Sequence, residues 1–143
     1  MIGLDTNILI YAHRAEMPEH ARCWSIVTVL AEAREPWLIP FHCLVEFYGT
    51  VTKPNLFKTP TTRREAVEQI EIWMESPSLV VGVPRESYWR RLKQLIESAQ
   101  VTGAFIHDAH VAAICLDYGV SELWSNDAQM LRFREVNVRN PLN

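Results

Sequence analysis

The sequence predicts a single α/β domain over residues 1–143, with a central, mostly parallel sheet of four to five short strands flanked by helices on both faces. Three observations predict this fold. Short apolar runs alternate with longer segments whose apolar residues recur every three or four positions. The length of 143 residues suits one core, which at this size buries roughly 68–70% of the unfolded chain's surface. The composition, 48% hydrophobic and 22% charged, is that of a globular protein rather than a disordered one.

The first predicted elements are a strand and two helices. Residues 2–4 form a short apolar run, and the three residues from Asp5 to Asn7 all favour helix N-caps. Residues 8–14 allow one or two helical turns. After Pro18, the apolar side chains as far as position 31 lie three and four residues apart, on one face of a helix.

A second strand and a third helix follow. Pro36 ends the preceding helix, because the residue before a proline disfavours helical geometry, and residues 37–39 are predicted as a strand. Pro40 opens the next helix, whose apolar residues recur at helical spacing around Glu46. We expect this helix to end before Pro54.

The alternation continues in the second half of the chain. Thr62 and Glu65 fit a capping box that opens a helix. Residues 79–83 are predicted as a buried strand. The next helix begins near residue 88, and Gly103 is its expected C-terminal stop.

The last elements centre on residues 104–118, which are apolar almost all round. This pattern predicts a central, buried helix. Residues 122–124 are predicted as a short strand, residues 125–127 as a turn, and residues 136–138 as an edge strand.

The overall charge excludes a globally basic nucleic-acid-binding domain. Fourteen basic and seventeen acidic residues give a net charge of −3, so a nucleic-acid contact would depend on a local basic patch. The longest conspicuous apolar run, residues 24–31, is far shorter than the roughly 20 residues of a membrane span. The N-terminus lacks the basic start of a signal peptide. We therefore expect a soluble, cytoplasmic protein with no membrane contact. Its cysteines, far apart and without metal-binding spacing, are expected to be buried free thiols: Cys23, Cys43 and Cys115.

Four acidic residues are predicted to converge at one edge of the sheet. Each has an ordinary explanation when taken alone: Asp5 and Asp127 as N-caps after strands, Glu46 on the wet side of a helix, and Asp108 as a first-turn acid. Together they occupy positions that meet outside the carboxyl ends of parallel strands. Close carboxylates repel one another by about 4 kcal/mol per pair at an effective dielectric of about 20, so a fold that gathers them binds something positive. An all-oxygen cluster suits Mg²⁺ or Mn²⁺, the cations of phosphate chemistry.

Four segments carry a resemblance to a known family. They are L-D-T-N at 4–7, L-V-E-F at 44–47, H-D-A-H-V-A-A at 107–113 and S-N-D at 125–127. In this order, and over the whole chain, they resemble the PIN domain and are most similar to the stand-alone toxins of VapC type. The resemblance implies a PIN-like fold and an Mg²⁺- or Mn²⁺-dependent endoribonuclease that cleaves RNA. It also implies a toxin paired with a cognate antitoxin protein, and a homodimer.

The same resemblance assigns roles to individual residues. It implies that the catalytic, metal-binding residues are the four acids Asp5, Glu46, Asp108 and Asp127. Asn7 and Ser125 match the polar positions that steady the metal ligands. Many members carry a further acid two residues after the last aspartate, whereas this chain has Gln129. We therefore expect the cluster to hold one metal well and a second one poorly.

Several other residues are candidates with ordinary explanations. The stretch from 47 to 64 holds four basic residues and no acid, which makes it the candidate RNA-contact patch: Lys53, Lys58, Arg63 and Arg64. A second basic pair, Arg90 and Arg91, is better explained as a solvated helix face. His107 and His110 lack the Glu of a zincin motif and are expected to be structural histidines. The expected role of Trp73 and Trp89 is simple packing.

Two rival functions remain open on the sequence. A phosphatase or phosphoryl-transfer domain would use Asp5 as its nucleophile, but such D-x-D enzymes need an acid where this chain has Asn7. The other rival is a non-enzymatic RNA-binding or interaction module, in which the acids are helix caps and surface residues.

Overall fold

The centre of the protein is a five-stranded, entirely parallel sheet. The computed structural model describes residues 1–143 and gives the strand order β3-β2-β1-β4-β5. The strands are β1 (Ile2–Leu4), β2 (Trp37–Pro40), β3 (Leu79–Gly82), β4 (Glu122–Trp124) and β5 (Val138–Arg139). The prediction of an α/β fold with a parallel sheet is confirmed. The first strand of the chain lies in the middle of the sheet.

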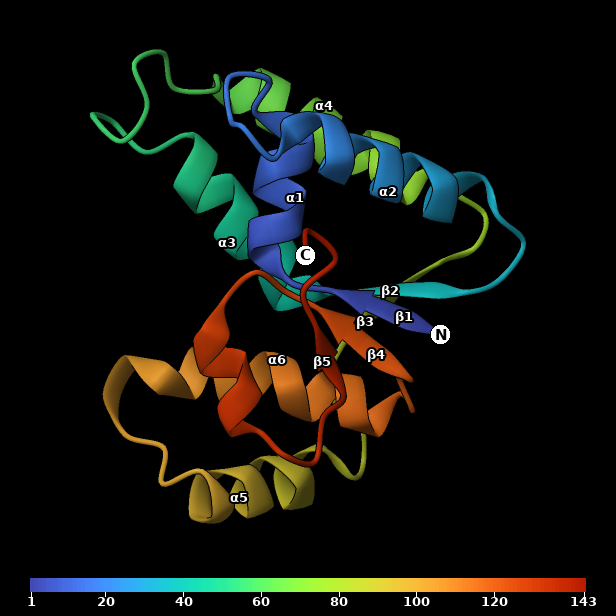
Figure 1. The fold of residues 1–143 in the computed structure, drawn as a ribbon, viewed down its shortest axis with the longest axis vertical. Helices are drawn as coiled ribbons and strands as arrows, with labels where there is room; N and C mark the ends of the chain where they lie inside the picture. Colours follow the sequence, from blue (N-terminus) through green and yellow to red (C-terminus); the bar gives the residue numbers. More distant parts are fainter.

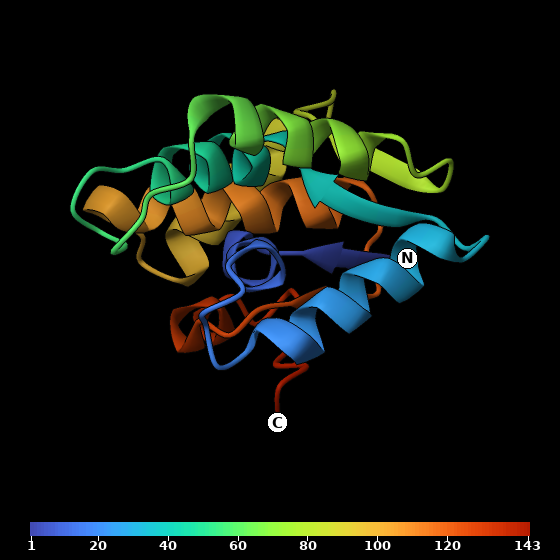
Figure 2. The same ribbon diagram turned by 90° about the horizontal axis from the view of Figure 1, so that it is seen from above.

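Helices cover both faces of this sheet. They are α1 (Thr6–His13), α2 (His20–Glu32), α3 (Phe41–Val51), α4 (Arg63–Met74), α5 (Tyr88–Ser98) and α6 (Ile106–Asp117), with the 3-10 helices η1 (Gly103–Phe105) and η2 (Ala128–Arg132). Figure 1 shows α1 to α4 on one side of the sheet and α5 and α6 on the other. From above, α1 is seen almost end-on beside β1, with α2 on one side of it and α3 on the other (Figure 2). None of these helices combines the length and apolar content required to cross a bilayer.

The core confirms the predicted central helix. Twenty-nine buried hydrophobic residues form one cluster. Half of α6 belongs to it: Ala109, Val111, Ala112, Ala113, Ile114 and Cys115. All three cysteines are buried free thiols, as predicted, and burial raises the pKa of Cys23 to about 11. These thiols therefore stay protonated near neutral pH and contribute packing.

Three expectations about elements were wrong. Gly103 does not end a helix: α5 ends at Ser98, and the chain reverses at Gln100, which has a positive φ of 52°. Gly103, with a φ of 60°, instead opens η1. The strand predicted as buried is the edge strand β3, in which only Gly82 is fully covered. The edge strand at the other end, β5, begins at Val138 rather than at 136.

The two tryptophans behave differently from each other. Trp73 is buried and stacks edge-on against Phe47, as expected for packing. Trp89 is 64% exposed, so the expectation that it packs in the core was wrong. Its helix, α5, is amphipathic, and its buried positions are Leu92 and Leu95.

Candidate functional site

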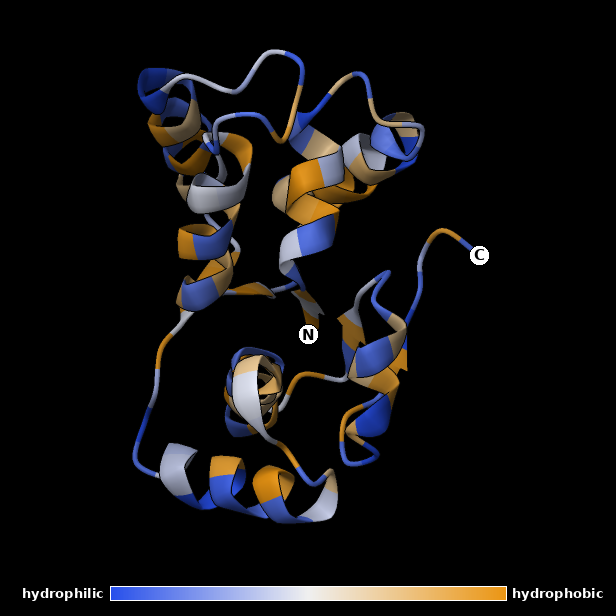
Figure 3. Cartoon of the chain, turned by 90° about the vertical axis from the view of Figure 1, so that its left-hand side faces the viewer, coloured by the Kyte–Doolittle hydropathy of each residue, from blue (hydrophilic) through white to orange (hydrophobic).

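The candidate site lies where β1 and β4 end. These strands pair in parallel with Leu4 opposite Trp124, so Asp5 and Ser125 are the next positions on neighbouring strands. The backbone N–H of Asp5 donates to the carbonyl of Trp124 at 3.0 Å, which holds the two strand ends together. Figure 3 views the molecule from the side on which these strands end. Parallel sheets bind their ligands at this edge.

Asp5 is the most enclosed acid of the site, with 6% of its surface exposed. Its Oδ1 accepts a 2.7 Å hydrogen bond from the N–H of Thr6 and so caps α1. Its Oδ2 accepts from the hydroxyl of Ser125 at 2.6 Å and from the amide of Asn7 at 3.0 Å. Burial raises the pKa of Asp5, the hydrogen bonds from Ser125 and Thr6 oppose the rise, and the carboxylates of Glu46 and Asp127 add to it. The hydrogen bonds thus fix the orientation of the Asp5 carboxylate, while burial and the nearby carboxylates disfavour its charged form.

Ser125 and Asn7 connect Asp5 to the turn after β4. The Ser125 hydroxyl donates to Asp5 and accepts from the N–H of Asp127 at 3.0 Å. It also accepts from the side-chain amide of Asn7 at 3.1 Å. The side-chain oxygen of Asn7, Oδ1, accepts a hydrogen bond from the backbone N–H of Asn126 at 2.9 Å. Two side chains therefore hold both strand ends in one arrangement.

The remaining three acids approach Asp5 from separate elements. Glu46, half-way along α3, accepts through Oε2 from the hydroxyl of Thr6 at 3.0 Å. Asp127 accepts through Oδ1 from the N–H of Gln129 at 2.9 Å and caps η2. Asp108 lies in the first turn of α6. Burial raises the pKa of Asp108 to about 6, helped by the carboxylates of Asp5, Asp127 and Glu46.

The four acids therefore lie close enough for their charges to interact. Their oxygen atoms are nevertheless not the most closely grouped metal-ligand atoms in the protein. The negative charge is largely uncompensated, because three carboxylates act on Asp108 and the only ion pair of these acids joins Glu46 to His42 at 2.6 Å. The ordinary N-cap explanation also holds for Asp5 and Asp127, because each caps a helix with one oxygen. The side chains whose ligand atoms all lie within 4.8 Å of one another are His42, Glu46 and His107.

The acidic donor set fits a hard divalent cation. Carboxylate and hydroxyl oxygens are the ligands that Mg²⁺ and Mn²⁺ prefer. A bound cation would also offset the repulsion that raises the pKa of Asp108. Asp5, Glu46, Asp108 and Asp127 are therefore the residues that would hold such an ion.

The sequence-based expectation holds for one of the two histidines singled out on α6 and misses a third histidine on α3. His110 is structural, as expected, because its Nδ1 is hydrogen-bonded to the hydroxyl of Tyr88. His107 is exposed beside His42 and Glu46, so its expected structural role was wrong. His42 was not singled out at all. The available signal was its spacing of four residues from Glu46, which places both on one face of α3.

The predicted basic patch is exposed but not uniform. Lys53 and Lys58 lie in the loop after α3, and Arg63 and Arg64 open α4. Arg64 pairs with Glu68 at 2.8 Å, which leaves less of its charge for a ligand. The loop is tied to the body of the protein by Arg14, whose guanidinium donates to the carbonyl of Thr59 at 2.8 Å.

Comparison with known proteins identifies relatives of this chain. The PIN domain family model matches residues 2–136. Ribonuclease VapC43 of Mycobacterium tuberculosis is 34% identical over 142 residues, which cover 99% of this chain and 96% of the relative. A VapC ribonuclease of Mycobacterium bovis matches to the same extent.

Solved structures share the fold. VapBC-1 from nontypeable Haemophilus influenzae superposes with a TM-score of 0.69 at 17% identity, covering 100% of both chains. VapC20 of Mycobacterium tuberculosis, described as a sarcin-ricin loop cleaving toxin, has a TM-score of 0.67 at 16% identity. That match covers 92% of this chain and 93% of VapC20.

Proposed function

The chain belongs to the PIN-domain family and, within it, to the VapC ribonucleases. On this basis we propose that it is a divalent-metal-dependent endoribonuclease. We propose further that it is the toxin of a type II toxin–antitoxin pair and that RNA is its substrate. Two relatives at 34% identity carry the name ribonuclease, and one structural neighbour is VapBC-1 of Haemophilus influenzae. The proposed cofactor is Mg²⁺ or Mn²⁺.

One observation carries the proposal. Asp5 is buried, fixed by three hydrogen bonds, and lies within electrostatic reach of Glu46, Asp108 and Asp127. A fold does not hold four such acids together for stability, because each raises the proton affinity of the others. The arrangement is what a hydrolase needs to bind a divalent ion beside a phosphodiester.

The side chains of the site orient the acids that would hold the cation and set their charge. When bound, the cation lowers the pKa of a water molecule and stabilises negative charge on the phosphoryl oxygens. Ser125 and Asn7 hold Asp5 Oδ2 in a fixed direction, so the carboxylate does not reorganise during the reaction. Burial and the neighbouring carboxylates raise the pKa of Asp108 to about 6 in the metal-free protein, and a bound cation would favour its charged form and so keep it available as a ligand.

Two partners follow from the proposal. The exposed side chains of Lys53, Lys58, Arg63 and Arg64 are the proposed contacts to RNA phosphates. The second partner is a cognate antitoxin, and the proposed assembly is a homodimer of the toxin. A groove of about 220 Å³ between α3 and α4 is lined only by hydrophobic residues and suits an apolar antitoxin segment: Phe41, Leu44, Val45, Tyr48, Ile70 and Met74.

The test is cleavage of a mixed pool of structured RNA with Mg²⁺, Mn²⁺ or EDTA, followed by mapping of the cut ends. We expect discrete cuts with either ion and none in EDTA. Asp5→Asn and Asp108→Asn should abolish the cuts while the proteins stay folded by circular dichroism. Glu97→Gln removes an exposed acid on α5 and serves as the matched control.

Three results would overturn the proposal. Full cleavage by metal-stripped, repurified Asp5→Asn protein contradicts the site. Equal cleavage in EDTA contradicts the role of the metal. No cleavage with any ion favours the non-enzymatic RNA-binding module.

A further inference from the structure

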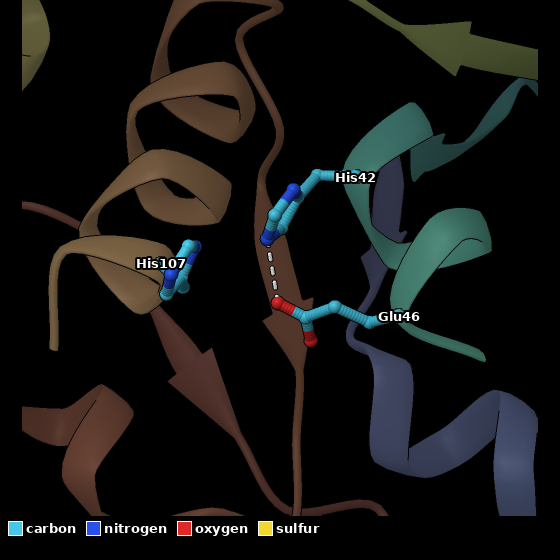
Figure 4. Close-up of side chains that lie close together, drawn as sticks. All are labelled: His42, Glu46 and His107. Atoms are coloured by element: carbon cyan, nitrogen blue, oxygen red, sulfur yellow. Dashed lines mark ion pairs between the residues drawn. The ribbon is translucent and has the colours of Figure 1, made fainter. Parts of the chain in front are cut away.

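Two histidines and a glutamate meet beside the acidic cluster. His42 and Glu46 lie one turn apart on α3, and His107 faces them from the first turn of α6 (Figure 4). The ligand atoms of all three lie within 4.8 Å of one another. The rings of His42 and His107 are parallel to within 3°, with centroids 5.2 Å apart.

His42 Nε2 is buried and forms an ion pair with Glu46 Oε1 at 2.6 Å, drawn as the dashed line in Figure 4. No hydrogen bond to another group accompanies this ion pair. The imidazole nitrogen and the carboxylate oxygen therefore already meet at one point, where a cation can take both atoms as ligands.

The donor set differs in chemical type from the neighbouring carboxylates. Two imidazoles and one carboxylate, with a position left for water, form a ligand set that binds Zn²⁺. Imidazole nitrogen suits Zn²⁺ and other late transition metals, whereas Mg²⁺ prefers oxygen alone. A tetrahedral zinc ion separates its ligand atoms by about 3.4 Å, given metal–ligand bonds near 2.1 Å. The 2.6 Å between His42 Nε2 and Glu46 Oε1 must therefore lengthen when the ion binds, and the exposed ring of His107 completes the group.

Neighbouring side chains pack against His42, the least exposed histidine of the set. The ring of His110 packs edge-on against His42, at 4.7 Å between centroids and 86° between planes. His110 is itself fixed by its hydrogen bond to Tyr88. This packing limits the ring orientations open to His42.

We propose that His42, Glu46 and His107 form a second cation site, selective for Zn²⁺ or a similar transition metal, that shares Glu46 with the carboxylate cluster. A zinc ion bound there engages Glu46 and withdraws it from the Mg²⁺ ligands. The second site is therefore inhibitory. This inhibitory role rests on the proposed ribonuclease function, whereas the binding of zinc does not.

The binding experiment needs no RNA. Zn²⁺ is titrated calorimetrically into the metal-free full chain, and Co²⁺ is added in parallel to record the visible absorption of a tetrahedral nitrogen-containing site. We expect one Zn²⁺ per chain. Both His42→Gln and His107→Gln should bind Zn²⁺ about tenfold more weakly or worse. Each removes a direct ligand, and the loss of even a residue that supports a ligand has an effect of this size. His20→Gln removes a histidine at the start of α2 and should bind as the parent does.

The variants also separate the two cation sites. Asp127→Asn alters the carboxylate cluster and leaves His42, Glu46 and His107 in place, so Zn²⁺ binding should persist. Unchanged Zn²⁺ affinity in His107→Gln, an exposed position that tolerates substitution, overturns the site. So does loss of Zn²⁺ binding in a folded Asp127→Asn protein.

The activity experiment tests the shared glutamate. Zn²⁺ is titrated into the Mg²⁺-supported cleavage reaction, where the parent should lose activity and His107→Gln should require at least about tenfold more Zn²⁺ for the same loss. Zinc binding without inhibition contradicts the sharing of Glu46. Zinc binding by a chain that cleaves no RNA supports the second site and refutes the ribonuclease proposal.

Discussion

Asp108 is subject to two opposing influences in the first turn of α6. The helix dipole favours a charged acid there by about 0.3–1 kcal/mol. Burial and three neighbouring carboxylates disfavour the charge and raise the pKa of this group to about 6. In metal-free protein the second influence should dominate, and in metal-bound protein the cation should remove it.

Asp108→Asn should therefore stabilise the metal-free protein. Screening by solvent at this half-buried side chain limits the gain to about 1 kcal/mol, which raises Tm by about 3–5 °C. Added Mn²⁺ should reverse the order, because the parent alone gains the full free energy of binding. Thermal melts of both proteins in EDTA and in millimolar Mn²⁺ measure this. A variant that is less stable in EDTA and equally responsive to Mn²⁺ would identify Asp108 as a helix-dipole acid rather than a ligand.

The pH dependence of the same pair has a defined sign. The folded pKa of Asp108, about 6, is higher than the unfolded value of about 4, so the folded state binds the proton more tightly. The parent should lose stability relative to Asp108→Asn as pH rises from about 4 through about 6. Below about pH 4 the effect of this charge on the difference vanishes, and above about pH 7 it is constant. Urea midpoints at several pH values in EDTA check this profile.

At the residue scale, the sequence predicted which acids follow strands better than it predicted which side chains contact each other. Asp5 and Asp127 could be placed after strands because apolar runs precede them, and strand pairing then brought both to one edge. The pairing of His42 with His107 could not be predicted, because it depends on how α3 and α6 face each other. A histidine four residues before a glutamate is otherwise an ordinary pair on a helix surface.

Gly82 shows why β3 and α6 pack closely. A Cβ added at Gly82 would lie 2.7 Å from Ile114 Cγ2 and 3.3 Å from Leu38 Cδ1. Ile114 is β-branched and stiff in a helix, so it cannot move away easily. The absence of a side chain at Gly82 therefore sets the distance between the edge strand and the central helix.

Gly82→Ala should destabilise the protein by about 1–3 kcal/mol through overpacking. The matched control is Gly49→Ala, in the interior of α3, where an added Cβ meets nothing within 4 Å. That change should stabilise the protein by about 0.5–1 kcal/mol, because alanine is the better helix residue. Urea denaturation of the two variants should give shifts of opposite sign. Equal shifts would show that the contact with Ile114 does not limit the packing.

At the element scale, prolines and apolar runs located most helices and strands. Pro36 precedes β2 and Pro40 is its last residue, and Thr62 caps α4 by accepting a 3.1 Å hydrogen bond from the N–H of Glu65. The end of α5 was mispredicted because the helix stops at a non-glycine residue with positive φ, Gln100, which propensity disfavours. Burial of β3 was mispredicted because strand order depends on long-range pairing and not on local sequence.

The whole molecule exposes hydrophobic side chains on the helices near its site. Val45 is 55% exposed on α3, next to Glu46, and lines the apolar groove between α3 and α4. We expect an antitoxin to cover this groove and to place a cationic side chain near the acids, because an uncompensated acidic cluster attracts positive charge. A disordered segment that folds on binding can wrap such a surface.

Val45→Glu should weaken binding of the antitoxin by about tenfold or more. The antitoxin is expected to be the product of the gene adjoining that of this chain. Leu131→Glu changes an equally exposed hydrophobic residue on η2 and should leave the affinity unchanged. Calorimetric titration of the three toxin proteins measures both effects. A complex that cleaves RNA at the rate of the free chain would refute inhibition through this surface.

The central position of β1 also determines when the site comes into existence. Asp5 leaves the ribosome at the start of synthesis, but the hydroxyl that orients it belongs to Ser125, 120 positions later in the chain. Pairings between such distant positions are slow to form. A nascent or prematurely terminated chain therefore keeps its carboxylates apart, whatever local helices it has made. If the chain is the toxin proposed above, this delay is protective, since an antitoxin already present can meet the chain before it becomes active.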